Sequence, residues 1–234
     1  MRKALIVLVL ALTAWPATTW AGNLTLRAGA FFPRADSNLF SDATEFYTLD
    51  PLAGGRPPGL SASDWIGVTG GIEYNGVLAR NVEFGIHVDG YGRTLDTSYR
   101  DYTRQNDADI LQTLKLTMVP SGVTVRFIPT GRRGRLAPYV GGGVDAIYYE
   151  FEAFGDFIDF FDPDQPILAD SFRSTGWALG FHVLGGIRVP LGRDFNLVGE
   201  YRYQWAEDDM GGDFSLNRID LSGGSATLGV NIRF

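Results

Sequence analysis

The sequence predicts an all-β fold, an eight-stranded antiparallel up-and-down transmembrane β-barrel with four long outer loops and short periplasmic turns. Three observations support this prediction. Apolar and polar residues alternate in eight segments, long polar connections alternate with short ones, and the polar parity of the segments carries many charges. A period of two places successive side chains on opposite faces of a strand, so each segment has one apolar and one polar face.

The N-terminal residues have the pattern of a signal peptide. Arg2 and Lys3 precede a short apolar run, and a small-residue cleavage pattern ends at Ala21. We therefore assign residues 1–21 to a signal peptide and residues 22–234 to a single barrel domain. The chain contains no cysteine, which argues against a lipid anchor and against disulfide bonds. No later stretch has the roughly 18 consecutive apolar residues that a transmembrane helix needs.

The first three segments, 24–32, 66–74 and 82–91, alternate regularly. The short stretch 76–80 forms a turn between the second and the third. The residues of the apolar parity are Leu24, Leu26, Ala28, Ala30 and Phe32, then Ile66, Val68, Gly70, Ile72 and Tyr74, then Val82, Phe84, Ile86 and Val88. Such segments are typical of strands that separate an apolar from a polar environment.

The fourth segment, 110–127, is less regular. Its apolar residues change parity near Pro120, because Leu114 and Leu116 fall on one parity and Val123 and Val125 on the other. Proline cannot donate a ladder hydrogen bond and is tolerated at bulges. We therefore predict a β-bulge near Pro120.

The last four segments, 136–151, 176–190, 195–205 and 226–234, alternate regularly again. Their apolar parity consists of Val140, Val144, Ala146 and Tyr148, then Trp177, Leu179, Phe181, Val183, Ile187 and Val189, then Phe195, Leu197, Tyr201, Tyr203 and Trp205, then Ala226, Leu228, Val230, Ile232 and Phe234. The pattern predicts four further strands, which completes an even-numbered barrel.

The connections between the segments alternate in length and in charge. The long connections are 33–64, 94–109, 152–174 and 206–218, and together they contain 19 acidic residues and 6 arginines. The short connections carry Arg80, Arg132, Arg133, Arg135 and Arg193. Long outer loops and short periplasmic turns are typical of outer-membrane barrels, and a closed barrel satisfies its backbone hydrogen bonds in lipid.

The polar parity of the segments is expected to face the lumen. A soluble ligand-binding barrel would have the opposite polarity, with apolar side chains inside. An eight-stranded barrel is just wide enough for side chains, so charges inside it must pair. The predicted lumen charge network is Arg27, Glu73, Glu83, His87, Asp89, Arg126, Asp145, His182, Arg188, Glu200, Arg202 and Arg233. Its acids and arginines balance, which favours a polar plug over a gated pore, and the two histidines are expected to be members of this polar core.

The end of the chain resembles a known assembly signal. The stretch from Thr227 to Phe234 has a polar residue, a glycine, a hydrophobic residue and a terminal aromatic residue at the spacing that the barrel-assembly machinery recognises, with Thr227, Gly229, Ile232 and Phe234 at those positions. Residues 138–144 and 199–203 also resemble recurring strand motifs. Through these motifs the chain resembles the small outer-membrane β-barrel superfamily of OmpA-, OmpW- and opacity-like proteins. The resemblance implies a place in the outer membrane, with lipid, lipopolysaccharide, the assembly machinery and periplasmic chaperones as partners.

A structural or surface-interaction role with a lumen closed by charge pairs is the leading functional prediction. The alternative is porin-like passage of small hydrophobic solutes past a lid in the loop 152–174. The proposed lid residues are spaced as on one face of a helix, although a helix or hairpin packed on the barrel rim is the favoured interpretation of this loop. These residues are Phe154, Phe157, Ile158 and Phe161.

The remaining functional classes have weaker support in the sequence. The acidic residues are expected to keep the outer loops soluble and extended, with recruitment of cations at the cell surface as the alternative. We predict no enzyme, because no local motif joins a serine, a histidine and an acid. We also expect no cofactor and no metal site, since the aspartates after Phe154 match no calcium loop. The acidic chain has no basic stripe, so nucleic-acid binding is not expected.

Overall fold

The computed structural model describes residues 22–49, 59–131 and 136–234. The predicted signal peptide and three arginines of one predicted turn, Arg132, Arg133 and Arg135, lie outside the described residues. Among the described residues, no helix is both long and apolar enough to span a bilayer.

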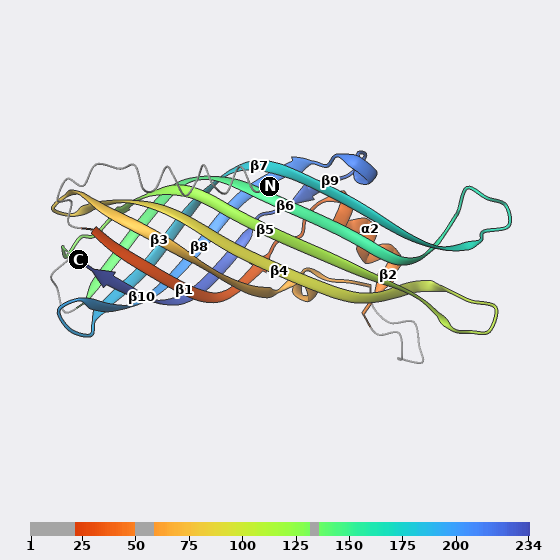
Figure 1. Cartoon of the computed structure of the whole chain (residues 1–234), viewed down its shortest axis with the longest axis horizontal. Helices are drawn as coiled ribbons and strands as arrows, with labels where there is room; N and C mark the ends of the chain where they lie inside the picture. Colours follow the sequence, from red (N-terminus) through yellow and green to blue (C-terminus); the bar gives the residue numbers. More distant parts are fainter. Residues whose placement is uncertain (1–21, 50–58, 132–135) are drawn as a thin grey trace.

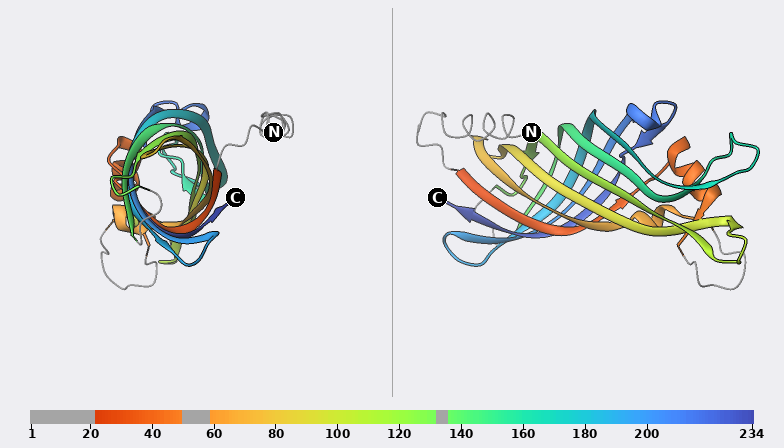
Figure 2. Two further views of the ribbon diagram at one scale, coloured as in Figure 1. Left: turned by 90° about the vertical axis from the view of Figure 1, so that its left-hand side faces the viewer. Right: turned by 45° about the vertical axis from the view of Figure 1, so that its right-hand side comes forward.

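Eight long antiparallel strands form a closed ring (Figures 1 and 2). They are β1 (Gly22–Pro33), β3 (Gly67–Ala79), β4 (Val82–Thr103), β5 (Asp109–Phe127), β6 (Ala137–Ile158), β7 (Ile167–Pro190), β8 (Phe195–Asp209) and β10 (Gly223–Arg233). Each strand pairs with its neighbour in the chain, and β10 pairs with both β8 and β1, which closes the ring. The predicted eight-stranded up-and-down barrel is therefore confirmed.

The outer surface of the barrel is apolar, as lipid requires. Leu26, Val68, Val144, Leu179 and Leu228 are all more than 45% exposed on this surface. Aromatic pairs bound this belt at both ends, with Tyr148–Trp177 and Tyr203–Trp205 toward the outer end and Tyr74–Phe234 at the periplasmic end. Aromatic girdles of this kind mark the two membrane interfaces of outer-membrane barrels.

The predicted bulge near Pro120 is wrong. The β5–β6 register runs without a shift from the pair Gln112–Gly155 to the pair Phe127–Val140. The apolar Leu116 and the polar Thr124 both face the barrel interior, where both are buried. The apparent change of parity therefore has another cause, because the interior itself changes from polar at the periplasmic end to apolar at the outer end.

The predicted loops 94–109 and 152–174 consist largely of strand. β4 continues to Thr103 and β5 begins at Asp109. β6 and β7 form a hairpin whose tip is 159–166. In Figure 1 these two hairpins project beyond the rest of the barrel at the outer end. The predicted loop 206–218 likewise contains the end of β8, the short helix η2 (Gly212–Phe214) and the start of β9 (Arg218–Asp220).

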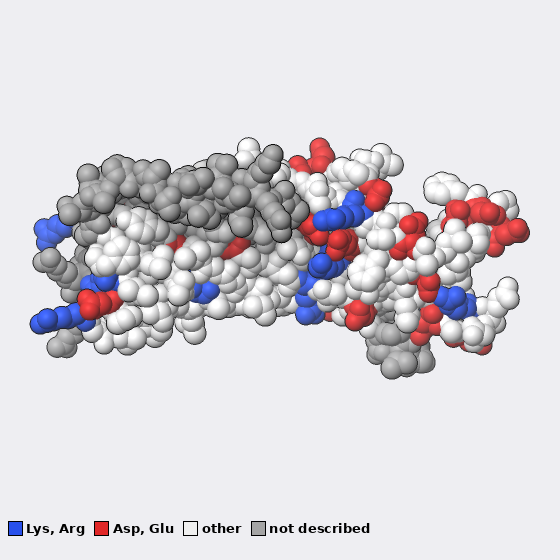
Figure 3. Space-filling view, in the orientation of Figure 1, with Lys and Arg blue, Asp and Glu red and all other residues white. Residues whose placement is uncertain are grey.

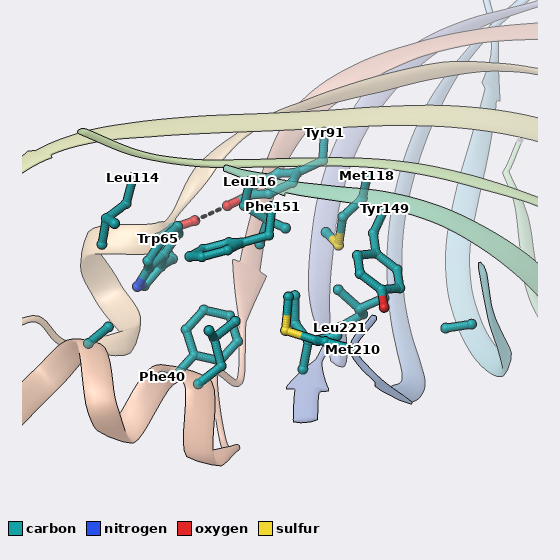
Figure 4. Close-up of a cluster of buried hydrophobic side chains, with 14 of the residues drawn as sticks. Phe40, Trp65, Tyr91, Leu114, Leu116, Met118, Tyr149, Phe151, Met210 and Leu221 are labelled. Carbon is teal, nitrogen blue, oxygen red and sulfur yellow. Dashed lines mark hydrogen bonds between the residues drawn. The ribbon is translucent and has the colours of Figure 1, made fainter. Parts of the chain in front are cut away.

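The outer half of the interior is filled by an apolar core. The first long connection folds inward as α2 (Asn38–Phe46), followed by β2 (Tyr47–Thr48) and η1 (Ala62–Trp65). Phe40 of α2 and Trp65 of η1 meet edge to face and pack over Phe151 (Figure 4). The hydroxyl of Tyr91 donates to the carbonyl of Trp65, which fixes η1 against the wall. α2 was not predicted from the sequence.

Candidate functional site

The centre of the lumen contains a network of arginines and carboxylates. Arg27 on β1 donates to Glu73 at 2.6 Å, to Asp89 at 2.6 Å and to Glu200 at 3.1 Å. Strand pairing fixes this arrangement. Arg27 lies opposite Gly71, and Glu73 is two residues further along β3, so its side chain is on the same face as that of Arg27. All these side chains are buried or nearly so.

Two further arginines complete this central network. Arg126 on β5 donates to both oxygens of Glu73 and, at 2.8 Å, to Glu200. Arg202 on β8 donates to Asp89 and to Glu200, at 3.2 Å in each case. Carboxylates that accept several charge-assisted hydrogen bonds are held firmly in place. The network therefore cross-links β1, β3, β4, β5 and β8 through the lumen.

A second ion pair lies on the periplasmic side of this network. Arg188 on β7 makes a bidentate pair with Glu83 on β4, with distances of 2.7 and 2.9 Å. The ring of Tyr139 lies between Arg188 and Arg126, with each guanidinium carbon just over 5 Å from the ring centroid. The hydroxyl of Tyr139 donates to Glu200 at 3.0 Å, so Tyr139 connects the two groups of charges.

Neutral amides form a further layer nearer the periplasm, which the sequence analysis missed. Asn75 donates to Asn23 at 3.2 Å, Asn196 donates to Asn231 at 2.8 Å, and Asn231 donates to Thr25 at 2.8 Å. All five side chains are buried. Their inward parity is visible in the sequence, but they carry no charge and so fall outside the predicted charge network.

The two histidines share one carboxylate. Asp145 on β6 has one oxygen 2.7 Å from Nδ1 of His182 and the other 3.0 Å from Nε2 of His87. The hydroxyl of Thr124 lies 3.0 Å from Nε2 of His182 and 3.4 Å from Nδ1 of His87. All four residues are buried, and no spacing motif in the sequence predicts that they meet.

Arg233 is not part of the charge network. It lies at the periplasmic end, where it donates to the carbonyl of Gly192 at 3.5 Å, and among the described residues no carboxylate pairs with it. It lines a periplasmic vestibule of about 740 Å³ together with Asn23, Glu83 and Arg188. β10 ends here, so this inward-facing side chain reaches the mouth of the barrel instead of its interior.

The lumen is closed at two levels above this vestibule. The ion-pair network blocks the inner half, and the apolar core blocks the outer half. Between them remains a void of about 20 Å³ beside Arg27, Asp89 and Met118, which has room for about one water molecule. The buried ion pairs therefore fit a barrel with a closed lumen.

The proposed lid residues do not share one face. Phe154, Phe157 and Ile158 belong to β6, and Phe161 lies fully exposed in the hairpin tip. The helical spacing predicted for these residues is wrong. A short apolar run fits both the helical and the strand periodicity, and pairing with β7 makes this segment a strand. Of the four residues, Phe157 faces an apolar pocket, where its ring meets Phe172 edge to face.

This outer pocket has a volume of about 290 Å³. It lies between α2, the β6–β7 hairpin and η2, and Leu39, Phe46, Phe157 and Phe214 are among its lining residues. Asp42, Asp213 and Asn217 add polar groups to the lining. Burial raises the pKa of Tyr47 in its wall above the ordinary value, so this phenol stays neutral.

The residues of the predicted assembly signal lie on β10 or directly after it. Thr227 pairs with Glu200 of β8, Gly229 pairs with Arg27 of β1, and Phe234 stacks on Tyr74. Ile232 lies opposite Leu24 on β1. These contacts place the signal at the seam where the barrel closes, and its recognition by the assembly machinery remains a prediction.

Charges are distributed unevenly along the barrel axis. Figure 3 shows acidic side chains gathered toward the outer end, where several basic side chains accompany them, and a few basic side chains at the periplasmic end. Just above the outer aromatic girdle, Lys115 pairs with Glu152 at 3.1 Å and Arg173 pairs with Glu150 at 2.6 Å. The Arg173 guanidinium lowers the pKa of Glu150. These two ion pairs, here called the charge ladder, mark the level at which the apolar belt ends.

Comparisons with known proteins agree with this architecture. No curated protein sequence matches the chain. The outer membrane protein OprG from Pseudomonas aeruginosa is 14% identical, with 92% of this chain and 97% of that chain covered and a TM-score of 0.51. Neisserial surface protein A is 14% identical, with coverages of 91% and 96% and a TM-score of 0.48. At 14% identity the likeness to OprG shows the fold alone.

Another similar structure is the outer membrane protease OmpT from Escherichia coli. OmpT is 11% identical, with 72% of this chain and 64% of that chain covered and a TM-score of 0.45. The family model described as "Outer membrane protein beta-barrel domain" matches residues 4–234. The chain therefore belongs to the outer membrane protein beta-barrel domain family and is an integral protein of the outer membrane.

Proposed function

We propose that this protein is a non-conducting barrel whose role is structural or lies in interactions at the cell surface. The observation that carries the proposal is the closure of the lumen at two levels, by the arginine–carboxylate network and by the apolar core. A path along the axis would require several buried ion pairs to separate at once, which is costly. The outer end, with its acidic hairpins, is then the surface available to partners.

Single-channel recording in planar bilayers tests this proposal. We expect no discrete openings from the refolded wild-type barrel. Glu200→Ala removes the acceptor shared by Arg27, Arg126, Arg202 and Tyr139, and Glu207→Ala is a matched control at an exposed position of the same strand. Wild-type openings that grow in Glu200→Ala but not in the control would instead make the lumen a gated path.

We also propose that the protein is not an enzyme. Thr124, His182 and Asp145 do have the order of a hydroxyl, a base and an orienting acid. However, Thr124 is completely buried, and the small central void touches none of the three residues. A substrate therefore has no place beside this hydroxyl.

A second candidate function is capture of a small hydrophobic solute at the outer end. The apolar pocket beside α2 supports it, because its volume and aromatic lining suit a small apolar molecule. We expect N-phenyl-1-naphthylamine to bind the barrel in nanodiscs, and Phe157→Glu to weaken binding at least tenfold. Phe160→Glu, at the exposed hairpin tip, is the control. Equal binding by both variants would reject the pocket.

We propose three kinds of partner for this barrel. Lipid and lipopolysaccharide would contact the apolar belt and the charge ladder above it, and divalent cations would associate with the acidic outer end. The closing position of β10 supports recognition of its terminal residues by the barrel-assembly machinery, with delivery by periplasmic chaperones.

A further inference from the structure

The buried charges of the lumen do not cancel. Four carboxylates, Glu73, Glu83, Asp89 and Glu200, have arginine partners within salt-bridge distance. Asp145 has none among the described residues, and only the two imidazoles reach it. Its side chain is 1% exposed. Since a buried charge without compensation is unfavourable, the position of Asp145 calls for a cation.

Two atoms beside Asp145 that could ligate a metal have no hydrogen bond. Nε2 of His87 and Oδ1 of Asp145 are only 3.0 Å apart, yet neither has a hydrogen-bond partner among the described residues. The contact between them does not have the alignment of a regular hydrogen bond. Atoms that ligate a metal point to a common centre instead of to each other, so this close but poorly aligned approach of His87 to Asp145 is compatible with a shared cation.

A third donor completes the group. His182 contacts the other oxygen of Asp145, and donor atoms of the three residues lie within 4.8 Å of one another. Zinc binds imidazole nitrogen and carboxylate oxygen at roughly 2.0–2.2 Å, so small side-chain movements bring all three donors to one centre. Two imidazoles and one carboxylate form a donor set that suits zinc and neighbouring transition metals better than calcium or magnesium.

Two inward-facing glycines make room for these side chains. A Cβ atom on Gly122 would lie 2.1 Å from Oδ1 of Asp145, and one on Gly143 would lie 2.8 Å from Cε1 of His182. The strand register puts Gly122 between His87 and Asp145, and Gly143 beside His182. The barrel wall is therefore recessed at this group of residues.

Thr124 orients both rings. Its single hydroxyl faces the remote nitrogen of each histidine, at 3.0 and 3.4 Å, so that the other nitrogen of each ring faces Asp145. Hydrogen bonds to the remote nitrogen of a ligating histidine are a regular feature of metal sites. We propose that His87, Asp145 and His182 bind one divalent transition-metal ion, with Zn²⁺ as the best-suited ion, and so tie β4, β6 and β7 together inside the barrel.

Metal retention by the refolded barrel tests the proposal. The chain has only two histidines, so an untagged protein reports on this site alone among imidazole sites. The barrel is loaded with Zn²⁺, washed with excess Ca²⁺ to clear the acidic outer end, and analysed for bound zinc. We expect about one zinc per wild-type chain and at least a tenfold loss in His182→Gln. Asp213→Asn, an exposed outer acid, is the control and should retain the metal.

X-ray absorption at the zinc edge provides a measurement that does not depend on the variants. We expect a wild-type spectrum with scattering from two imidazole rings, which acidic outer residues alone cannot produce. Heat-modifiable gel mobility shows that each sample is folded. A wild-type barrel that retains no zinc, a spectrum without imidazole scattering, or full retention by folded His182→Gln would each overturn the proposal.

Discussion

Glu73 shows how the lumen network determines stability at the scale of single residues. Its carboxylate is inaccessible to solvent and accepts hydrogen bonds from both Arg27 and Arg126. Arg202 lies 3.6 Å away. Three guanidiniums therefore share Glu73, Asp89 and Glu200 for charge compensation, and none of them can turn toward water in a closed lumen.

Replacing Glu73 with glutamine should destabilise the barrel strongly. The substitution keeps the shape of the side chain but leaves the neighbouring guanidiniums undercompensated, and breaking a buried pair in this way costs about 3–5 kcal/mol. Urea unfolding followed by gel mobility measures the change. Glu207→Gln, whose partner Arg218 is more than half exposed, should change the unfolding free energy by less than about 1 kcal/mol. Equal effects of the two substitutions would contradict the role assigned to the network.

The parity of a residue was predictable, but its partner was not. Alternation placed Arg27, Glu73 and Arg126 inside, as the structure has them. Which arginine meets which carboxylate depends on the register of all eight strands and on the stagger of the ring. His87, Asp145 and His182 meet for the same reason, although they lie far apart in the chain and no spacing motif connects them.

At the scale of elements, α2 determines how the outer mouth closes. Leu39, Phe40 and Ala43 form its buried face, and the helix has no side-chain hydrogen bond from its N-cap residue Ser37. A nine-residue helix is marginal in water by itself. Its stability must therefore come from packing against Trp65 and the barrel wall, which a prediction from local pattern does not contain.

Phe40→Ala should release α2 from the core. Removing this buried ring costs about 3–5 kcal/mol of packing, more than the short helix can supply from its own hydrogen bonds. We expect faster protease cleavage within residues 33–49 while the barrel keeps its heat-modifiable mobility. Phe46→Ala is the control on the same helix, since Phe46 is 39% exposed, and it should be cleaved at the wild-type rate. Cleavage of the Phe40 variant at that rate would mean that α2 does not depend on this contact.

The strands themselves were predicted best where they cross the membrane. There, lipid on one side and a polar lumen on the other impose strict alternation, and all eight segments were found. Beyond the outer girdle the same strands have water on one face and an apolar core on the other, so the pattern is inverted or lost. This change explains both the misplaced bulge at Pro120 and the helix predicted from Phe154 to Phe161.

At the scale of the whole molecule, the barrel has three zones along its axis. An apolar belt faces lipid around a polar, ion-paired lumen, an apolar core lies inside the outer half, and acidic hairpins project beyond it. Each zone has the polarity that its surroundings require, so the position of the membrane is determined by the side chains. The tryptophans of residues 22–234 lie in two of these zones, because Trp177 and Trp205 face outward at the girdle of the apolar belt and Trp65 is 2% exposed within the core.

Quenching of tryptophan fluorescence by brominated lipids should therefore differ between the three positions. In single-tryptophan variants of residues 22–234, with phenylalanine at the other two positions, we expect strong quenching at Trp177 and Trp205. Trp65 should be quenched several-fold less, because the wall and α2 separate it from lipid. Acrylamide in water provides the complementary measurement and should also reach Trp65 poorly. Strong quenching of Trp65 by lipid would place the apolar core inside the bilayer, whereas no quenching at Trp177 would remove that strand from the lipid-facing surface.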